Sequence, residues 1–306
     1  MLFRYSYLDG VWVDLEQPSE SEVRQVAQEF SISERIETEL LSPSPAPLVA
    51  GDENVLLLVL HFPSHGNEDG EPKSQEVDVV IGRHCILTVR YEVIAPLHHL
   101  QKLLETQKII VGRAPMTTDV LVEVLFAHLY ASVRDHTNHI ASRLVRTEEL
   151  MFSGHERNTV RAISVISREF LHLEAALANQ EGPLSRFLKT LEERKFFSAS
   201  FSERAARIIA ERAQVDHLIR THRAVATELR ETNAALLEAR QNEIMKTLTV
   251  ITFIMLPLEL ITLIFGMHLP GTPFEHSAEG FWIVVAAMVI LVGLLTSVFA
   301  RKRWLF

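Results

Sequence analysis

The sequence predicts an α+β membrane protein with an N-terminal α/β domain, long helices after it and two transmembrane helices at its C-terminal end. Three observations support this fold class. Segments typical of strands lie before about residue 115, and long segments without Gly or Pro begin at Thr117. Two apolar segments follow, and the only charged residues between 248 and 300 are three glutamates. This contrast with the charged remainder predicts that part of the chain lies in lipid.

Residues 1–115 are expected to form the α/β domain. Its predicted strands are rich in β-branched and aromatic residues and are bounded by Gly, Pro or Asn. A helix is predicted to start at Ser19, because Glu22 completes a capping box three positions later. A hairpin is predicted at Gly82-Arg83, and residues 42–54 are predicted to be a loop. The four predicted strands are residues 2–8, 55–62, 76–82 and 84–90.

Residues 116–247 are expected to form a stalk of long helices in the cytoplasm. One predicted helix runs from Thr117 to Phe152 and a second over 157–179, with a shorter helix after Gly182-Pro183. From Ser202 the helical pattern continues without a breaker to Gly266, roughly 95 Å at 1.5 Å per residue. Uncapped helices of this length are typical of coiled coils and membrane stalks.

Two segments of twenty residues, 248–267 and 281–300, are predicted to span the membrane. Each matches the ~20 residues that a helix needs to cross a ~30 Å hydrocarbon core. The connecting residues 268–280 contain no Lys or Arg, whereas Lys246 precedes the first span and a basic tail, 301–306, follows the second. The positive-inside rule therefore predicts that both termini are cytoplasmic and that the connection is external.

The composition argues against several other classes of protein. A net charge of −9 makes nucleic acid an improbable partner. A single cysteine, Cys85, excludes a disulfide framework and indicates a reducing compartment. We find no glycine pattern for a dinucleotide or a P-loop and no arrangement that indicates a catalytic triad, so we expect neither an enzyme nor a resident cofactor.

The first predicted span carries a polar stripe at heptad spacing. A lipid-facing surface should be apolar, and a carboxylate such as Glu259 is costly within a membrane. One hairpin cannot enclose a pore, but several copies can if their stripes face a common axis, which predicts a cyclic homo-oligomer. Alternatively, Glu259 and the threonines hydrogen-bond to the second span. The stripe contains Asn242, Met245, Thr249, Thr252, Leu256, Glu259, Leu263 and Gly266.

The C-terminal motifs resemble those of the CorA family of divalent metal-ion transporters. They are NEIMKTLT at 242–249, FIMLPL at 253–258, Gly-Met-His at 266–268 and RKRWL at 301–305. The resemblance implies a funnel-shaped homopentamer in the plasma membrane, which in a bacterium is the inner membrane. The first span would line its pore, a divalent cation would be its cargo, and no cofactor would be bound. Gly266, Met267 and His268 would shape the outer mouth.

The chain departs from the family signature at His268, where the family has asparagine. Amide oxygens suit hydrated Mg²⁺, whereas imidazole suits Zn²⁺, Ni²⁺ or Co²⁺ better. The loop containing Gly271 and Pro273 also resembles that of the ZntB-type zinc branch. The identity of the transported ion therefore stays undecided between Mg²⁺ or Co²⁺ and Zn²⁺ or Ni²⁺. In the alternative interpretation, His268 only packs at the outer mouth and binds no ion.

The pathway implied by these residues begins at external acids and ends in the stalk. Glu275 and Glu279 would collect cations, His268 and Glu259 would contact the metal, and rings of Leu256 and Met245 would form hydrophobic constrictions. The family also uses cytoplasmic acids as metal sensors, and the candidates are Asp78, Asp119, Glu123, Asp135, Glu203, Glu211 and Asp216. The rival interpretation is a membrane-anchored scaffold or metal sensor without transport.

Overall fold

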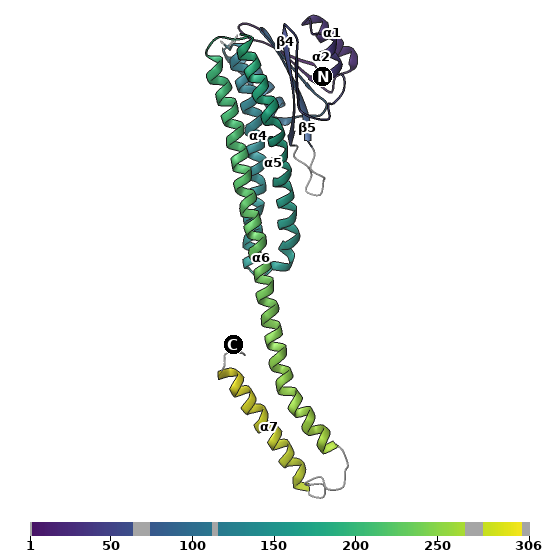
Figure 1. Ribbon diagram of the computed structural model, residues 1–306, viewed down its shortest axis with the longest axis vertical. Helices are drawn as coiled ribbons and strands as arrows, with labels where there is room; N and C mark the ends of the chain where they lie inside the picture. Colours follow the sequence, from purple (N-terminus) through teal and green to yellow (C-terminus); the bar gives the residue numbers. More distant parts are fainter. Residues whose placement is uncertain (1, 64–73, 112–115, 267–277, 302–306) are drawn as a thin grey trace. The chain divides into compact units, whose positions relative to one another are not determined.

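The structure is a computed structural model that describes residues 2–63, 74–111, 116–266 and 278–301 (Figure 1). It divides into two compact units, Met1–Arg230 and Glu231–Phe306. One helix, α6 (Phe201–Gly266), contributes residues to both units.

The first unit begins with a six-stranded sheet in the order β1-β2-β6-β5-β4-β3. β2 and β6 pair in parallel and the other neighbours are antiparallel, so the predicted β5–β6 hairpin is confirmed. The strands are β1 (Leu2–Ser6), β2 (Val11–Glu16), β3 (Leu48–Gly51), β4 (Val55–Pro63), β5 (Ser74–Gly82) and β6 (Cys85–Arg90).

Two of these strands were not predicted. β3 lies within residues 42–54, so the prediction that this whole segment is a loop is wrong. It is an edge strand of four residues, and its pairing with β4 aligns Leu48 with Val59. β2 pairs with β6, some seventy residues later in the chain, through a register that aligns Val11 with Cys85. Such long-range pairing leaves little trace in the local pattern.

Two short helices, α1 (Glu20–Glu29) and α2 (Glu34–Glu39), follow β2. The predicted capping box at the start of α1 is confirmed. The backbone N–H of Glu22 donates to Ser19 Oγ at 3.3 Å, and the Ser19 N–H donates to Glu22 Oε2 at 2.9 Å. Both helices bury their apolar side chains against one face of the sheet, in a core that includes Val13, Val26, Ile36, Leu57 and Val80.

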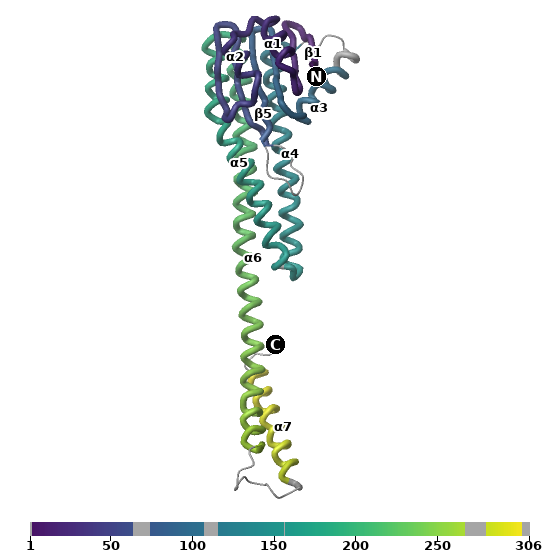
Figure 2. The backbone as a smooth tube through the Cα atoms, turned by 90° about the vertical axis from the view of Figure 1, so that its right-hand side faces the viewer, coloured from purple at the N-terminus to yellow at the C-terminus, as the bar shows by residue number. Residues whose placement is uncertain are grey.

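Three long helices pack beside the sheet (Figure 1): α4 (Thr118–Phe152), α5 (Glu156–Glu193) and the first part of α6. α3 (Ala95–Val111) leads into them, as the backbone trace shows (Figure 2). Gln180 of α5 is fully buried and joins the layers, because its amide donates to the His61 carbonyl of β4 at 2.7 Å and accepts from the Tyr130 hydroxyl of α4 at 3.0 Å.

Helix α5 is continuous through Gly182-Pro183, so the predicted break there is wrong. Proline removes one backbone hydrogen bond and crowds the preceding turn, which locally disfavours a helix. On either side of it, however, α5 buries Gln180, Leu184 and Phe187 against its neighbours. This packing offsets the local cost, and tertiary contacts decide the outcome.

The second unit contains the last part of α6 and helix α7 (Ala278–Arg301). Both helices are long and apolar enough to cross a membrane. The predicted unbroken helix from Ser202 is confirmed to within one residue, since α6 begins at Phe201 and ends at Gly266. The predicted second span, 281–300, lies inside α7.

Candidate functional site: the exposed face of helix α6

The last part of α6 has one face turned toward α7. Val250 is almost fully buried, and Ile254, Pro257 and Ile261 are half-buried at three- and four-residue spacing. The rings of Phe253 on α6 and Phe299 on α7 lie 6.4 Å apart. Within this unit, α7 therefore occupies that side of the helix.

The polar stripe predicted from the sequence lies on the other side of α6. At about 100° per residue, the centre of the stripe is roughly 160° around the helix from the face that contacts α7. Thr249 is half-buried and the remaining stripe residues are exposed: Asn242, Met245, Thr252, Leu256, Glu259, Leu263 and Gly266. In a single copy this face is thus mostly exposed.

The threonine hydroxyls of the stripe bond to their own helix. Thr249 Oγ1 donates to the Met245 carbonyl at 2.8 Å, and Thr252 Oγ1 donates to the Leu248 carbonyl at 2.9 Å. This geometry differs from the alternative in which these threonines bond to the second span. It also uses the hydroxyl proton, so the remaining lone pairs of each oxygen are acceptors that suit a cation.

Glu259 lies on the same exposed face, within the apolar part of α6. Among the described residues, no Lys, Arg or His forms an ion pair with it. A lone carboxylate that faces hydrocarbon is costly, which is why such residues usually face a bundle interior or a water-filled cavity. The exposed stripe therefore requires either further copies of the chain or water around it.

Several predicted residues of the outer mouth lie outside the described residues. These are Met267, His268 and Glu275. Gly266 is the last residue of α6, and Glu279 lies in the first turn of α7, although its side chain is also outside the described part. The proposed roles of these residues stay predictions.

Most of the acids considered as metal sensors in the first unit are paired with arginines of the same chain. Arg204 contacts Asp119 at 2.9 Å and Glu123 at 2.7 Å, and Arg134 contacts Glu211 at 2.6 Å. Asp216 likewise pairs with Arg220, at 3.0 Å, whereas Asp135 and Glu203 are exposed. Within the described ranges, no group of three or more His, Cys, Asp or Glu side chains is placed to hold a metal ion.

Asp78 differs from the other candidate acids because it is fully buried in the sheet. Its Oδ2 accepts a hydrogen bond from the Tyr91 hydroxyl at 3.2 Å, and Glu76, two residues earlier, is also buried. Burial, and secondarily the charge of Glu76, raises the pKa of Asp78 to about 9. Asp78 is therefore protonated at neutral pH, which the sequence did not predict.

Comparison with known proteins places the whole chain in one family. The family model described as "CorA-like Mg2+ transporter protein" matches residues 8–302. The cobalt/magnesium transport protein CorA of Methanocaldococcus jannaschii is 22% identical over 304 residues, which cover 96% of this chain and 91% of that protein. The cobalt/magnesium transport protein CorA of Thermotoga maritima is 21% identical over residues that cover 92% of this chain and 80% of that protein.

Solved structures share the fold. The complete CorA magnesium transporter of M. jannaschii superposes with a TM-score of 0.80 at 22% identity, covering 99% of this chain and 94% of that one. The ZntB cytoplasmic domain of Vibrio parahaemolyticus superposes with a TM-score of 0.61 at 10% identity, covering 76% and 90%. The family match over residues 8–302 and the common fold lead to one conclusion: the chain belongs to the CorA-like Mg²⁺ transporter family.

Proposed function

We propose that the protein transports divalent metal cations across a membrane through a pore lined by the exposed stripe of α6. The observation that carries this proposal is the position of the stripe, opposite the face that contacts α7. Several copies arranged around an axis would turn Thr249, Thr252 and Glu259 toward a common path and leave α7 on the outside. Family membership supports a ring of five copies, with magnesium or cobalt as cargo in the named relatives.

The proposed path has polar rings separated by apolar ones. Oxygens of Glu259 and of the threonines would replace part of the hydration shell of the ion. Leu256 and Met245, which are 61% and 54% exposed in the single chain, would form rings that close by dewetting. Both termini would lie in the cytoplasm, because the basic residues flank the apolar helices on that side.

The membrane potential is sufficient to drive uptake. Moving one elementary charge across 100 mV is worth about 2.3 kcal/mol, so a divalent cation gains about 4.6 kcal/mol when the inside is negative. This driving force requires no nucleotide, in keeping with the lack of a P-loop pattern in the sequence.

The direct test is flux through the purified protein in liposomes, with Mg²⁺, Co²⁺, Ni²⁺ and Zn²⁺ compared. Glu259→Gln should lower the flux or change its pH dependence, because it removes the only charge of the stripe. Glu243→Gln is the matched control, since Glu243 is an exposed glutamate of the same helix that lies off the stripe. A chain that carries none of the four ions would favour a membrane-anchored scaffold or metal sensor.

The same assay tests the ion preference expected of His268. Five imidazoles at an outer mouth would favour Zn²⁺, Ni²⁺ or Co²⁺ over Mg²⁺. We expect His268→Asn to shift the ratio of Mg²⁺ to Zn²⁺ flux toward Mg²⁺, with the amide oxygen binding an intact hydration shell. An unchanged ratio would mean that His268 only packs at the mouth.

A further inference from the structure

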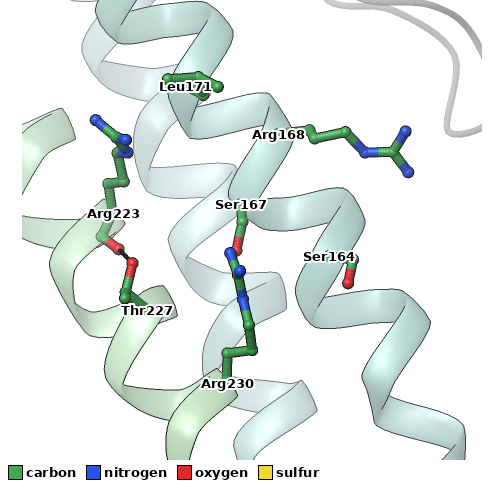
Figure 3. A pocket seen from close by; sticks show the side chains of 7 residues that line it. All are labelled: Ser164, Ser167, Arg168, Leu171, Arg223, Thr227 and Arg230. Carbon is green, nitrogen blue, oxygen red and sulfur yellow. Dashed lines mark hydrogen bonds between the residues drawn. The ribbon is translucent and has the colours of Figure 1, made fainter.

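A basic groove lies between α5 and α6 in the first unit (Figure 3). It encloses about 290 Å³ and is lined by Ser164, Ser167, Arg168 and Leu171 of α5 and by Arg223, Thr227 and Arg230 of α6. None of these lining residues is acidic, although the chain as a whole has a net charge of −9. We call this feature the basic groove.

Two of the three arginines are available for a partner. Arg223 contacts Glu174 of α5 and is held by it. Arg168 and Arg230 are exposed, and neither forms an ion pair with any residue in the described part of the chain. The groove therefore carries positive charge that the chain itself does not neutralise.

The arrangement of donors suits an extended partner better than a single small anion. Ser164, Ser167 and Thr227 donate their hydroxyl protons to the carbonyls of Val160, Ile163 and Arg223 at 2.9, 2.8 and 3.0 Å. The guanidinium groups of Arg168 and Arg223 point away from each other (Figure 3). Arg223 and Arg230 lie seven positions apart on α6, about 10 Å, and the third charge is on α5, so the positive charge is spread along the groove rather than directed at one point.

The same stretch of α6 carries two carboxylates that do not line the groove. Glu228 precedes Arg230 by two positions, which places it roughly 160° away around the helix, and Glu231 lies between them, roughly 100° from Arg230 and 60° from Glu228. Both glutamates are exposed, and neither forms an ion pair with a described residue. At one height, α6 therefore presents Arg230 on one side and Glu228 on the opposite side, with Glu231 on the exposed surface between them. We call Glu228 and Glu231 the acidic edge.

We propose that the basic groove of one copy receives the acidic edge of the next copy. A cyclic ring needs a heterologous interface, in which two different surfaces of each chain meet. If the ring axis follows α6, equivalent residues lie at equal height, so Glu228 and Glu231 of one copy come level with Arg168 and Arg230 of its neighbour. The proposal rests on the homo-oligomer of the proposed function and identifies which surfaces form it.

Disulfide crosslinking of the full-length protein in membranes tests this contact directly. Ser167→Cys and Glu228→Cys are introduced together in a Cys85→Ser background, which removes the only native thiol. Ser167 lines the groove and Glu228 lies on the far side of α6, so we expect bonds between copies. Oxidation should produce a ladder of covalent species that ends at the closed ring. Ser167→Cys with Glu203→Cys is the control, because Glu203 lies some 25 residues earlier on α6.

Charge reversal is the second test. Arg168→Glu with Arg230→Glu should raise the dissociation constant of the ring by about tenfold or more, since like charges would then face each other. Adding Glu228→Arg and Glu231→Arg should restore the ring. Arg157→Glu with Arg161→Glu, on exposed positions of α5 outside the lining, should change little.

The outcomes of these experiments distinguish the proposed contact between copies from the proposed transport of metal ions. Metal flux without a crosslinked ladder would contradict the proposed contact between copies but not the proposed transport. A ladder without metal flux would support the contact and contradict the transport. Failure of the fourfold charge reversal to restore the ring would also contradict the pairing. Saturable binding of inorganic phosphate or pyrophosphate, lost in Arg168→Glu with the ring unchanged, would show that the groove is an anion site instead.

Discussion

At the scale of single residues, Asp78 shows how burial changes the chemistry of a side chain. It lies in β5 with Glu76 on the same face of the strand, and the Tyr91 hydroxyl donates to it. The bidentate contact of Glu76 with the Ser44 N–H, at 2.9 Å to each oxygen, holds the second carboxylate in place. Two buried carboxyls this close are stable only if one keeps its proton.

We expect the stability of the folded protein to fall as the pH rises between about 4 and about 9. The unfolded chain releases the Asp78 proton near the ordinary aspartate pKa of 3.8, whereas burial in the folded protein raises this pKa to about 9. The folded state therefore binds more protons in this window, and the free energy of unfolding decreases toward alkaline pH. Asp78→Asn should flatten this slope and stabilise the protein above neutral pH by roughly 1–3 kcal/mol.

Thermal unfolding of the detergent-purified chain across this pH range would measure the effect. Asp135→Asn is the matched control, because Asp135 is an exposed aspartate of α4. The unfolding temperature of Asp135→Asn should change with pH as that of the parent protein does. Parallel profiles for the parent and Asp78→Asn would show that Asp78 is ionised in the folded state.

At the scale of elements, the two faces of the last part of α6 differ in their side chains and contacts. One face contacts α7 through apolar side chains, and the opposite face displays the polar stripe. Thr262 provides an internal reference, since it is a threonine of the same apolar stretch but lies off the stripe. Its hydroxyl donates to the Glu259 carbonyl at 2.8 Å, much as Thr252 donates to Leu248 at 2.9 Å.

We therefore expect Thr252→Val and Thr262→Val to differ in transport. Both substitutions remove a hydroxyl that bonds to the helix backbone, so their effects on helix stability should be similar. Only Thr252→Val removes an oxygen from the proposed pathway. It should lower ion flux in liposomes by roughly tenfold, equivalent to about 1.4 kcal/mol in the barrier. Equal losses in both variants would argue against a pathway along the stripe.

At the scale of the whole molecule, the proposed function depends on assembly. In a single chain Glu259 and its neighbours are exposed, and the residues that the structure describes enclose no path along them. The two apolar helices are long enough to span a membrane, but only a ring would surround the stripes with protein. Transport should therefore be a property of the ring rather than of its subunits.

Mixing subunits tests this dependence. Parent chains and Glu259→Gln chains, distinguished by tags, would be coexpressed in equal amounts and the ring population reconstituted. If one altered subunit blocks a ring of five, only about 3% of rings keep five parent chains, so flux should fall far below half. The same mixture made from separately assembled rings is the control. Flux that falls in proportion to the altered fraction would indicate independent pathways.

A feature of the fold or of the candidate site could be predicted from the sequence when neighbouring residues determine it. The capping box at Ser19 and the hairpin at Gly82 were predicted correctly, because neighbouring residues determine them. The strand β3 and the continuity of α5 through Pro183 were not, because distant contacts outweigh local preference there. The stripe was recognised from heptad spacing, whereas the buried carboxyls of Glu76 and Asp78 showed no local signal.

The positions of the apolar helices, the polar stripe of α6 and the family motifs could all be recognised from the sequence alone. Hydrophobicity and helical periodicity are local properties, so they can be read along the chain. Three features required the folded structure: the face of α6 that contacts α7, the pairing of acids with arginines, and the position of the basic groove. These features arise where residues far apart in sequence meet, and packing alone selects those meetings.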